Sequence, residues 1–137
     1  MSFIQFLVEF SIVGQSKIGR AIFKRSLAPR TTALIRYQLR NPIQSRVILR
    51  EGELSIPFKI GRAGPENAKH EVRRGEVAYW TQSNTLKIFL ENKKTDYPVN
   101  IVGSIDLETI SFFENLRIGK SIRLEMVQPS IDEADYL

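Results

Sequence analysis

Apolar and polar residues alternate along most of this chain, a pattern typical of β-strands that bury one face. The first such segment is 4–12, where every second residue is Ile, Phe or Val. The same period recurs in 18–27, 54–60, 86–90, 99–105 and 122–126. Two shorter apolar runs, 46–49 and 77–80, are typical of strands buried on both faces. The pattern therefore predicts eight strands in a β-rich chain.

Two segments break the alternation and predict helices. The first covers about 29–40, because Pro29 is tolerated in a first helical turn and Asn41-Pro42 ends the segment. The second covers about 106–116, where the side chain of Asp106 can cap the helix and Gly119 follows its end. Both helices are expected to pack against the sheet.

The connections define one expected domain over 1–127. No repeat or Pro/Gly-rich linker divides this range, and the acidic segment 128–137 lacks periodicity, so we expect a flexible tail there. The longest polar connection is 61–74, and 92–98 is a second loop. A loop as long as 61–74 is usually functional or mobile. We expect the backbone amides of 61–74 to be weakly protected from hydrogen exchange. This loop either acts as a lid or has no role.

Composition narrows the function classes. The chain has 137 residues, a net charge of +5 and no cysteine, which excludes disulfides, thiolate metal sites and cysteine nucleophiles. No apolar run reaches the ~18 residues of a membrane span, so a cytoplasmic protein without a membrane partner is the expectation. Residues 1–75 carry fourteen Lys and Arg against five Asp and Glu. This basic half is either a solvated face or a surface for an anionic partner such as nucleic acid.

Most catalytic templates are missing. His70 is the single histidine, so a histidine metal site is excluded, and no G-x-S-x-G nucleophile motif is present. Glu51 and Glu53 flank Gly52 in a predicted turn, where solvated carboxylates are expected. We therefore expect no metal and no cofactor.

The aromatic residues are more informative. Tyr79 and Trp80 are consecutive in a predicted strand, so one ring enters the core and the other faces solvent or a cleft. Phe89 has the opposite parity to its apolar neighbours 86, 88 and 90. Its face is either covered, for example by a helix, or part of an exposed apolar pocket.

Several blocks resemble the small prokaryotic cyclophilin-like proteins, a family largely of unknown function. They are Gly-Glu-Val-Ala-Tyr-Trp at 75–80, Leu-Lys-Ile-Phe at 86–89, Val-Asn-Ile-Val-Gly-Ser-Ile at 99–105 and Ile-Gly-Lys-Ser-Ile-Arg at 118–123. The resemblance covers about 45–127, and the first 44 residues fit in element order. It implies a closed eight-stranded antiparallel barrel capped by two helices.

The resemblance also implies a groove on the outer surface of the barrel. In cyclophilins an arginine and aromatic side chains hold a proline-containing peptide in this groove. The corresponding residues here are Arg46 as the polar anchor, with Phe58, Phe89 and one of Tyr79 or Trp80 as the walls. The Phe-Met-x-Gln-Gly-Gly segment of cyclophilins is absent, which disfavours isomerase activity.

Three functions follow as expectations. The first is binding of a peptide segment or small anionic molecule in the outer cleft. The alternatives are weak peptidyl-prolyl isomerase activity, in which Arg46 acts on the X–Pro amide, and binding of single-stranded nucleic acid through the basic half. Closed edges disfavour strand-edge dimers, so a monomer or a face-packed homodimer is expected.

Overall fold

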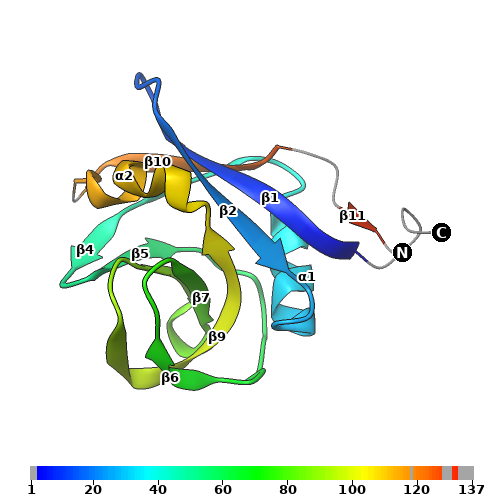
Figure 1. Ribbon diagram of the computed structural model, residues 1–137. Helices are drawn as coiled ribbons and strands as arrows, with labels where there is room; N and C mark the ends of the chain where they lie inside the picture. The colour runs from blue at the N-terminus through cyan, green and yellow to red at the C-terminus, as the bar shows by residue number, and fades with distance from the viewer. Residues whose placement is uncertain (1–2, 118, 128–130, 133–137) are drawn as a thin grey trace.

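The computed structural model describes residues 3–117, 119–127 and 131–132, and the chain is mainly β, as predicted. Ten strands precede the C-terminal segment, with two short α-helices among them (Figure 1). Their bounds are β1 Phe3–Ile12, β2 Ile18–Lys24, α1 Pro29–Gln38, β3 Ile43–Arg46, β4 Ile48–Arg50, β5 Glu53–Pro57, β6 Lys69–Val72, β7 Glu76–Trp80, β8 Thr85–Phe89, β9 Lys93–Ile105, α2 Ile110–Glu114 and β10 Ser121–Met126. Two single-turn 3₁₀ helices, η1 Thr81–Ser83 and η2 Leu107–Thr109, complete the described elements before β11.

The strands form one large antiparallel sheet in the order β3-β10-β1-β2-β9-β7-β8-β5-β4. Its two ends, β3 and β4, follow each other in the chain and are not paired by a ladder. The sheet curls around its core without closing, so the predicted closed barrel is wrong.

The sheet stays open because the predicted strand 46–49 divides at Val47. Before Val47 the chain pairs with β10, and after it with β5. Val47 itself is buried and exchanges backbone hydrogen bonds with Gly119 and Lys120. The backbone groups at the division therefore bond to the turn before β10, and the strand cannot pass continuously from one neighbour to the other.

Both predicted long loops contain strand. Lys69–Val72 forms β6 inside the segment 61–74, and residues 93–98 belong to β9. The two strands pair antiparallel, with Glu71 opposite Lys94 and Val72 opposite Lys93. The prediction of eight strands is therefore too low, and 61–74 is not the largely unpaired connection expected. β6 carries exposed polar side chains at three of its four positions, so its sequence lacks the apolar period that predicts a strand.

The predicted flexible tail lies mostly outside the described residues. Within it, Ile131–Asp132 forms β11, which pairs antiparallel with β1. In the main sheet β1 and β10 are neighbours despite their separation in sequence. The single domain over 1–127 stays a prediction.

The main core fills the inside of the curled sheet, and the helices close it. Phe10 and Phe113 are fully buried, with their rings in edge contact. α2 packs on β2 at Gly19, where any Cβ would lie within 2.6 Å of the rings of residues 112 and 113. α1 contacts β2 and β9, and its Thr31, Thr32 and Ile35 are buried. Within the described residues, none of the helices has the length and apolar character of a membrane span.

A carboxylate from the segment 61–74 caps α1. Ala28, at the N-cap position, provides no side-chain hydrogen bond. Glu66 instead accepts hydrogen bonds from the backbone N–H groups of Arg30 at 2.9 Å and Thr31 at 2.6 Å. The buried Asn100 of β9 in turn accepts a bond from the Glu66 N–H and donates to Gly64. This network fixes the chain before β6 against the helix. The negative charge of Glu66 also interacts favourably with the positive N-terminal end of the helix dipole.

Candidate functional site

Strands β5, β7 and β8 are buried on both faces, and the two faces differ in chemistry. The inner face carries the apolar side chains of the main core, such as Leu54, Leu86 and Ile88. The outer face of the same strands carries Glu53, Ser55, Thr85, Lys87, Phe89, Ala78 and Trp80. A second apolar cluster, Val72, Ala78, Phe89, Val99 and Ile101, forms where β6 and β9 cover this outer face.

A lysine and a glutamate form an ion pair beneath that cover. The ammonium of Lys87 lies 2.9 Å from Glu53 Oε1, and the two side chains are 3% and 6% exposed. Lys87 also donates to Ser55 Oγ at 2.7 Å. The strand register explains why these side chains contact each other. Ser55 lies opposite Lys87 on neighbouring strands, and Glu53 is two residues before Ser55 on the same face.

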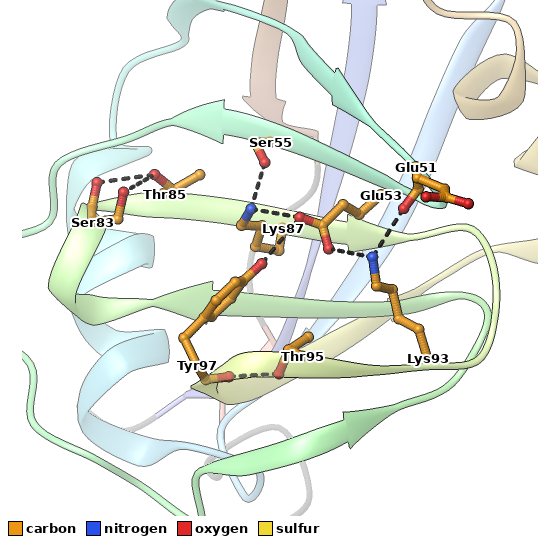
Figure 2. Close-up of polar contacts among 9 residues, drawn as sticks. All are labelled: Glu51, Glu53, Ser55, Ser83, Thr85, Lys87, Lys93, Thr95 and Tyr97. Atoms are coloured by element: carbon orange, nitrogen blue, oxygen red, sulfur yellow. Dashed lines mark hydrogen bonds and ion pairs between the residues drawn. The ribbon is translucent and has the colours of Figure 1, made fainter.

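Two residues of β9 complete the polar cluster (Figure 2). Lys93 Nζ lies 3.1 Å from Glu53 Oε2 and donates to the backbone carbonyl of Glu51 at 2.9 Å. The hydroxyl of Tyr97 donates to Glu53 Oε1 at 3.0 Å. Glu53 is therefore the common acceptor for two cations and one phenol, which come from β8 and β9.

The environment shifts the pKa values of this cluster in opposite directions. Burial alone raises the pKa of Glu53, but the hydrogen bond and charge of Lys87, helped by Lys93 and Tyr97, outweigh it and hold the pKa below its ordinary value. Burial and the neighbouring Glu53 carboxylate raise the pKa of the Tyr97 hydroxyl. Glu53 is therefore ionised at neutral pH, and Tyr97 keeps its proton as a hydrogen-bond donor.

Two aromatic rings lie beside the ion pair. Trp80 and Tyr97 are half-buried and stacked, with ring centroids 3.8 Å apart and planes inclined by 16°. Lys87 Nζ is 5.1 Å from the centre of each ring, within the range of a cation–π contact. The indole N–H of Trp80 is buried and has no acceptor among the described residues.

The rings and the ion pair line a cleft of about 390 Å³, here called the aromatic cleft. Its remaining lining comes from Arg50, Glu51, Lys93, Lys94, Thr95 and Asp96. A flat apolar surface with charged groups at its edge can hold a planar ring and orient a polar substituent.

A larger hollow adjoins the aromatic cleft. This trough has a volume of about 1020 Å³ and follows β6 and the turn that leads into β9. Its lining residues are Lys69, His70, Glu71, Val72, Arg73, Glu76, Asn92, Lys93 and Lys94. Lys93 and Lys94 line both hollows, so the trough lies next to the aromatic cleft.

The structure separates the five residues predicted to line one cleft. Phe58 and Tyr79 are buried in the main core, where the Tyr79 hydroxyl donates to the Phe58 carbonyl. Phe89 is fully buried in the second cluster, and Trp80 lines the aromatic cleft. Arg46 is exposed on β3 and lines neither hollow.

Opposite placement of Tyr79 and Trp80 is confirmed, and the face of Phe89 is covered. The cover consists of strands β6 and β9 rather than a helix.

Sequence reasoning missed most of the polar cluster. Glu53 was expected to be solvated in a turn, yet it is buried, and Tyr97 was assigned to a loop. The available signal was a pair of polar positions, Glu53 and Ser55, that alternate with apolar ones on a strand and match Lys87 on another. In the ranges 3–117, 119–127 and 131–132, no group of three or more His, Cys, Asp or Glu side chains could hold a metal.

Comparison with known proteins identifies related folds. No family model matches the chain, and no curated protein matches it. The hypothetical protein AF2241 from Archaeoglobus fulgidus has a similar structure, with a TM-score of 0.75, 20% identity and coverage of 91% of this chain and 97% of that one.

McbB, solved in complex with tryptophan, also has a similar structure. The TM-score is 0.70 at 14% identity, over 92% of this chain and 46% of the McbB chain. This chain therefore corresponds to about half the length of McbB. At these identities the likeness establishes the fold alone, and membership of the cyclophilin-like family stays a prediction.

Proposed function

We propose that this protein binds a small ligand with a planar ring and an anionic group in the aromatic cleft. The observation that carries the proposal is the stacked pair of Trp80 and Tyr97 beside the buried ion pair of Lys87 and Glu53. Half-buried rings at the edge of a cleft offer an apolar surface to a ligand ring.

The charges at the cleft favour an anionic substituent. Four cations, Arg50, Lys87, Lys93 and Lys94, line it against three carboxylates, Glu51, Glu53 and Asp96. Glu53 already contacts two of the cations, Lys87 and Lys93. Arg50 and Lys94 are exposed at the rim, where an incoming carboxylate or phosphate can meet them. An acceptor atom of the ligand would also satisfy the indole N–H of Trp80.

The buried ion pair gives independent support. Charged pairs in protein interiors contribute little stability compared with well-packed apolar residues. Their presence beside a cleft therefore favours a role in binding or chemistry.

Tryptophan is a suitable first probe because it combines a planar ring with a carboxylate. McbB, of which about half matches this fold, was solved in complex with tryptophan, which makes this molecule a natural first choice.

The test uses Trp80, the one tryptophan of the chain, whose indole N–H gives a single signal in a ¹⁵N–¹H spectrum. We expect tryptophan, indole-3-carboxylate and 4-hydroxybenzoate to shift this signal with dissociation constants of about 1 mM or below. Indole and phenol lack the anion, cyclohexanecarboxylate lacks the planar ring, and each should bind more weakly.

Matched variants assign the effect to the cleft. Lys94→Ala should weaken binding of the anionic probes and leave the neutral probes unchanged. Lys120→Ala removes an exposed lysine that lines neither hollow and should change nothing. If no planar anion shifts the Trp80 signal at ~10 mM, or if both variants behave alike, the proposal is wrong.

A peptide segment with an aromatic side chain offers the same ring to the cleft and stays an alternative ligand. Prolyl isomerase activity stays a prediction without added support, because its expected anchor, Arg46, does not line the cleft.

A further inference from the structure

The trough beside the aromatic cleft has the size and charge of a site for an extended anion. Pockets that bind one small ligand measure roughly 300–1,000 Å³. The aromatic cleft, at about 390 Å³, matches one such ligand, whereas the trough adds about 1020 Å³. The joint surface therefore has room for a ligand that continues beyond one ring.

The lining of the trough is predominantly basic. Lys69, Arg73, Lys93 and Lys94 are its four permanent cations, and Lys93 is already paired with Glu53. The carboxylates are those of Glu71 and Glu76. Glu76 is engaged within the chain, since it accepts a hydrogen bond from the backbone N–H of Arg73 at 2.7 Å.

The basic residues lie along one path. Glu71 is opposite Lys94 and Val72 opposite Lys93 in the β6–β9 ladder, so Arg73, which follows β6, lies beside these lysines. Lys69, at the other end of β6, lies opposite Val99. Lys93 and Lys94 then lead to the rings of Trp80 and Tyr97. A ligand along this path meets cations first and a flat aromatic surface at its end.

We propose that this surface binds single-stranded nucleic acid, with one base on the Trp80–Tyr97 rings and the following phosphates along the β6–β9 cations. The inference rests on the proposed function, because it uses the same aromatic cleft. A basic groove that leads to aromatic side chains is how proteins bind single strands with little sequence preference. An acidic polypeptide would satisfy the cations but would leave the rings without a regular partner.

Base stacking also requires an unpaired strand. In a duplex the bases are stacked on each other, and their faces are closed to protein side chains. The surface should therefore prefer a single strand to a duplex of the same length. DNA and RNA strands present the same phosphates and base faces, and parallel measurements with both will distinguish them.

The test measures fluorescence anisotropy of labelled oligothymidylate and oligouridylate of about 12 nucleotides. If three phosphates meet Lys69, Arg73 and Lys94, affinity should fall about 20-fold between ~50 and ~200 mM salt. The double variant Lys69→Ala/Arg73→Ala removes two of these contacts, so the same salt change should cost only about 3-fold. Arg117→Ala/Lys120→Ala removes equal charge at exposed residues outside both hollows and should keep the steep dependence.

The outcomes separate this inference from the proposed function. Mononucleotide binding at the Trp80 signal should survive Lys69→Ala/Arg73→Ala, because these residues do not line the aromatic cleft. If mononucleotides bind but oligonucleotides bind no more tightly, the inference fails and the proposed function stands. If oligonucleotides bind without shifting the Trp80 signal, no base lies on the rings and the inference fails, while the proposed function is still decided by the titration with small planar anions. Equal affinity for polyglutamate or for duplex DNA would also overturn the inference.

Discussion

Replacing Lys87 by methionine removes one charge of the buried ion pair while keeping most of the side-chain volume. The two side chains are 3% and 6% exposed, so the carboxylate left behind cannot turn to water without local opening. Removal of one partner from a buried pair costs about 3–5 kcal/mol. Glu53 keeps Lys93 and the Tyr97 hydroxyl, so we expect the lower end, about 3 kcal/mol, or roughly a 100-fold loss in the folding equilibrium.

The reverse change should cost more. Glu53→Leu leaves the ammonium of Lys87 with the Ser55 hydroxyl and the two rings, and no carboxylate within hydrogen-bond distance. We expect a loss near 5 kcal/mol. The double variant Lys87→Met/Glu53→Leu buries no charge at the pair and loses mainly hydrogen bonds worth about 1 kcal/mol each. It should therefore be more stable than Glu53→Leu alone.

Urea unfolding, followed by Trp80 fluorescence and far-UV circular dichroism, measures these free energies. Arg123→Met is the matched control, because Arg123 and Glu125 form a 3.7 Å ion pair that is 41% and 44% exposed. Its effect should stay within about 0.5 kcal/mol. If Lys87→Met behaves like this control, or if the double variant shows the sum of the single losses, the reasoning about the pair is refuted.

Two further predictions concern the cap on α1 and the close approach of the paired strands β2 and β9. Glu66→Gln should speed amide exchange at Thr31 and in 61–68, because it weakens the cap. Burial raises the pKa of Glu66, but its hydrogen bonds with Thr31 and Arg30 and the charge of Arg30 outweigh burial and lower the pKa from 4.5. The stabilising effect of the cap is therefore present above about pH 4.5 and is lost as pH falls through the lowered pKa. Unchanged amide exchange in the variant and in acid would contradict the cap. Gly103→Ala places a Cβ 2.1 Å from the Ile22 carbonyl oxygen, which should lower stability by at least ~2 kcal/mol in a thermal melt, whereas Gly64→Ala, with no atom within 4 Å, should not.

The sequence predicted those elements whose own residues show a clear local pattern of apolar positions or a clear start and stop. Alternation in 4–12 and 122–126 marked β1 and β10, because a strand with one buried face must place apolar side chains at every second position. Pro29 and the polar stop after residue 40 similarly marked α1. These signals are local, so they can be read without knowing the partner strand.

The wrong predictions concern segments whose structure depends on residues distant in sequence. β6 shows exposed polar side chains at three of its four positions, so nothing in its own pattern distinguishes it from a loop. The division at Val47 likewise depends on bonds to residues near 120, which the sequence around 47 does not reveal. Where pairing with a distant segment decides the secondary structure, the local sequence shows only a weak pattern of apolar and polar residues.

The aromatic cleft shows the same division between sequence and tertiary structure. By itself the sequence determined a β-rich chain, the opposite faces of Tyr79 and Trp80, and a basic half. Only the fold brought Glu53 within reach of Lys87, 34 residues away, and of Tyr97, 44 residues away. A charged residue on a strand is ordinarily solvated, and these became buried only because β6 and β9 cover the outer face of the sheet. Burial of a polar side chain is decided by what covers it, and that cover comes from residues distant in sequence.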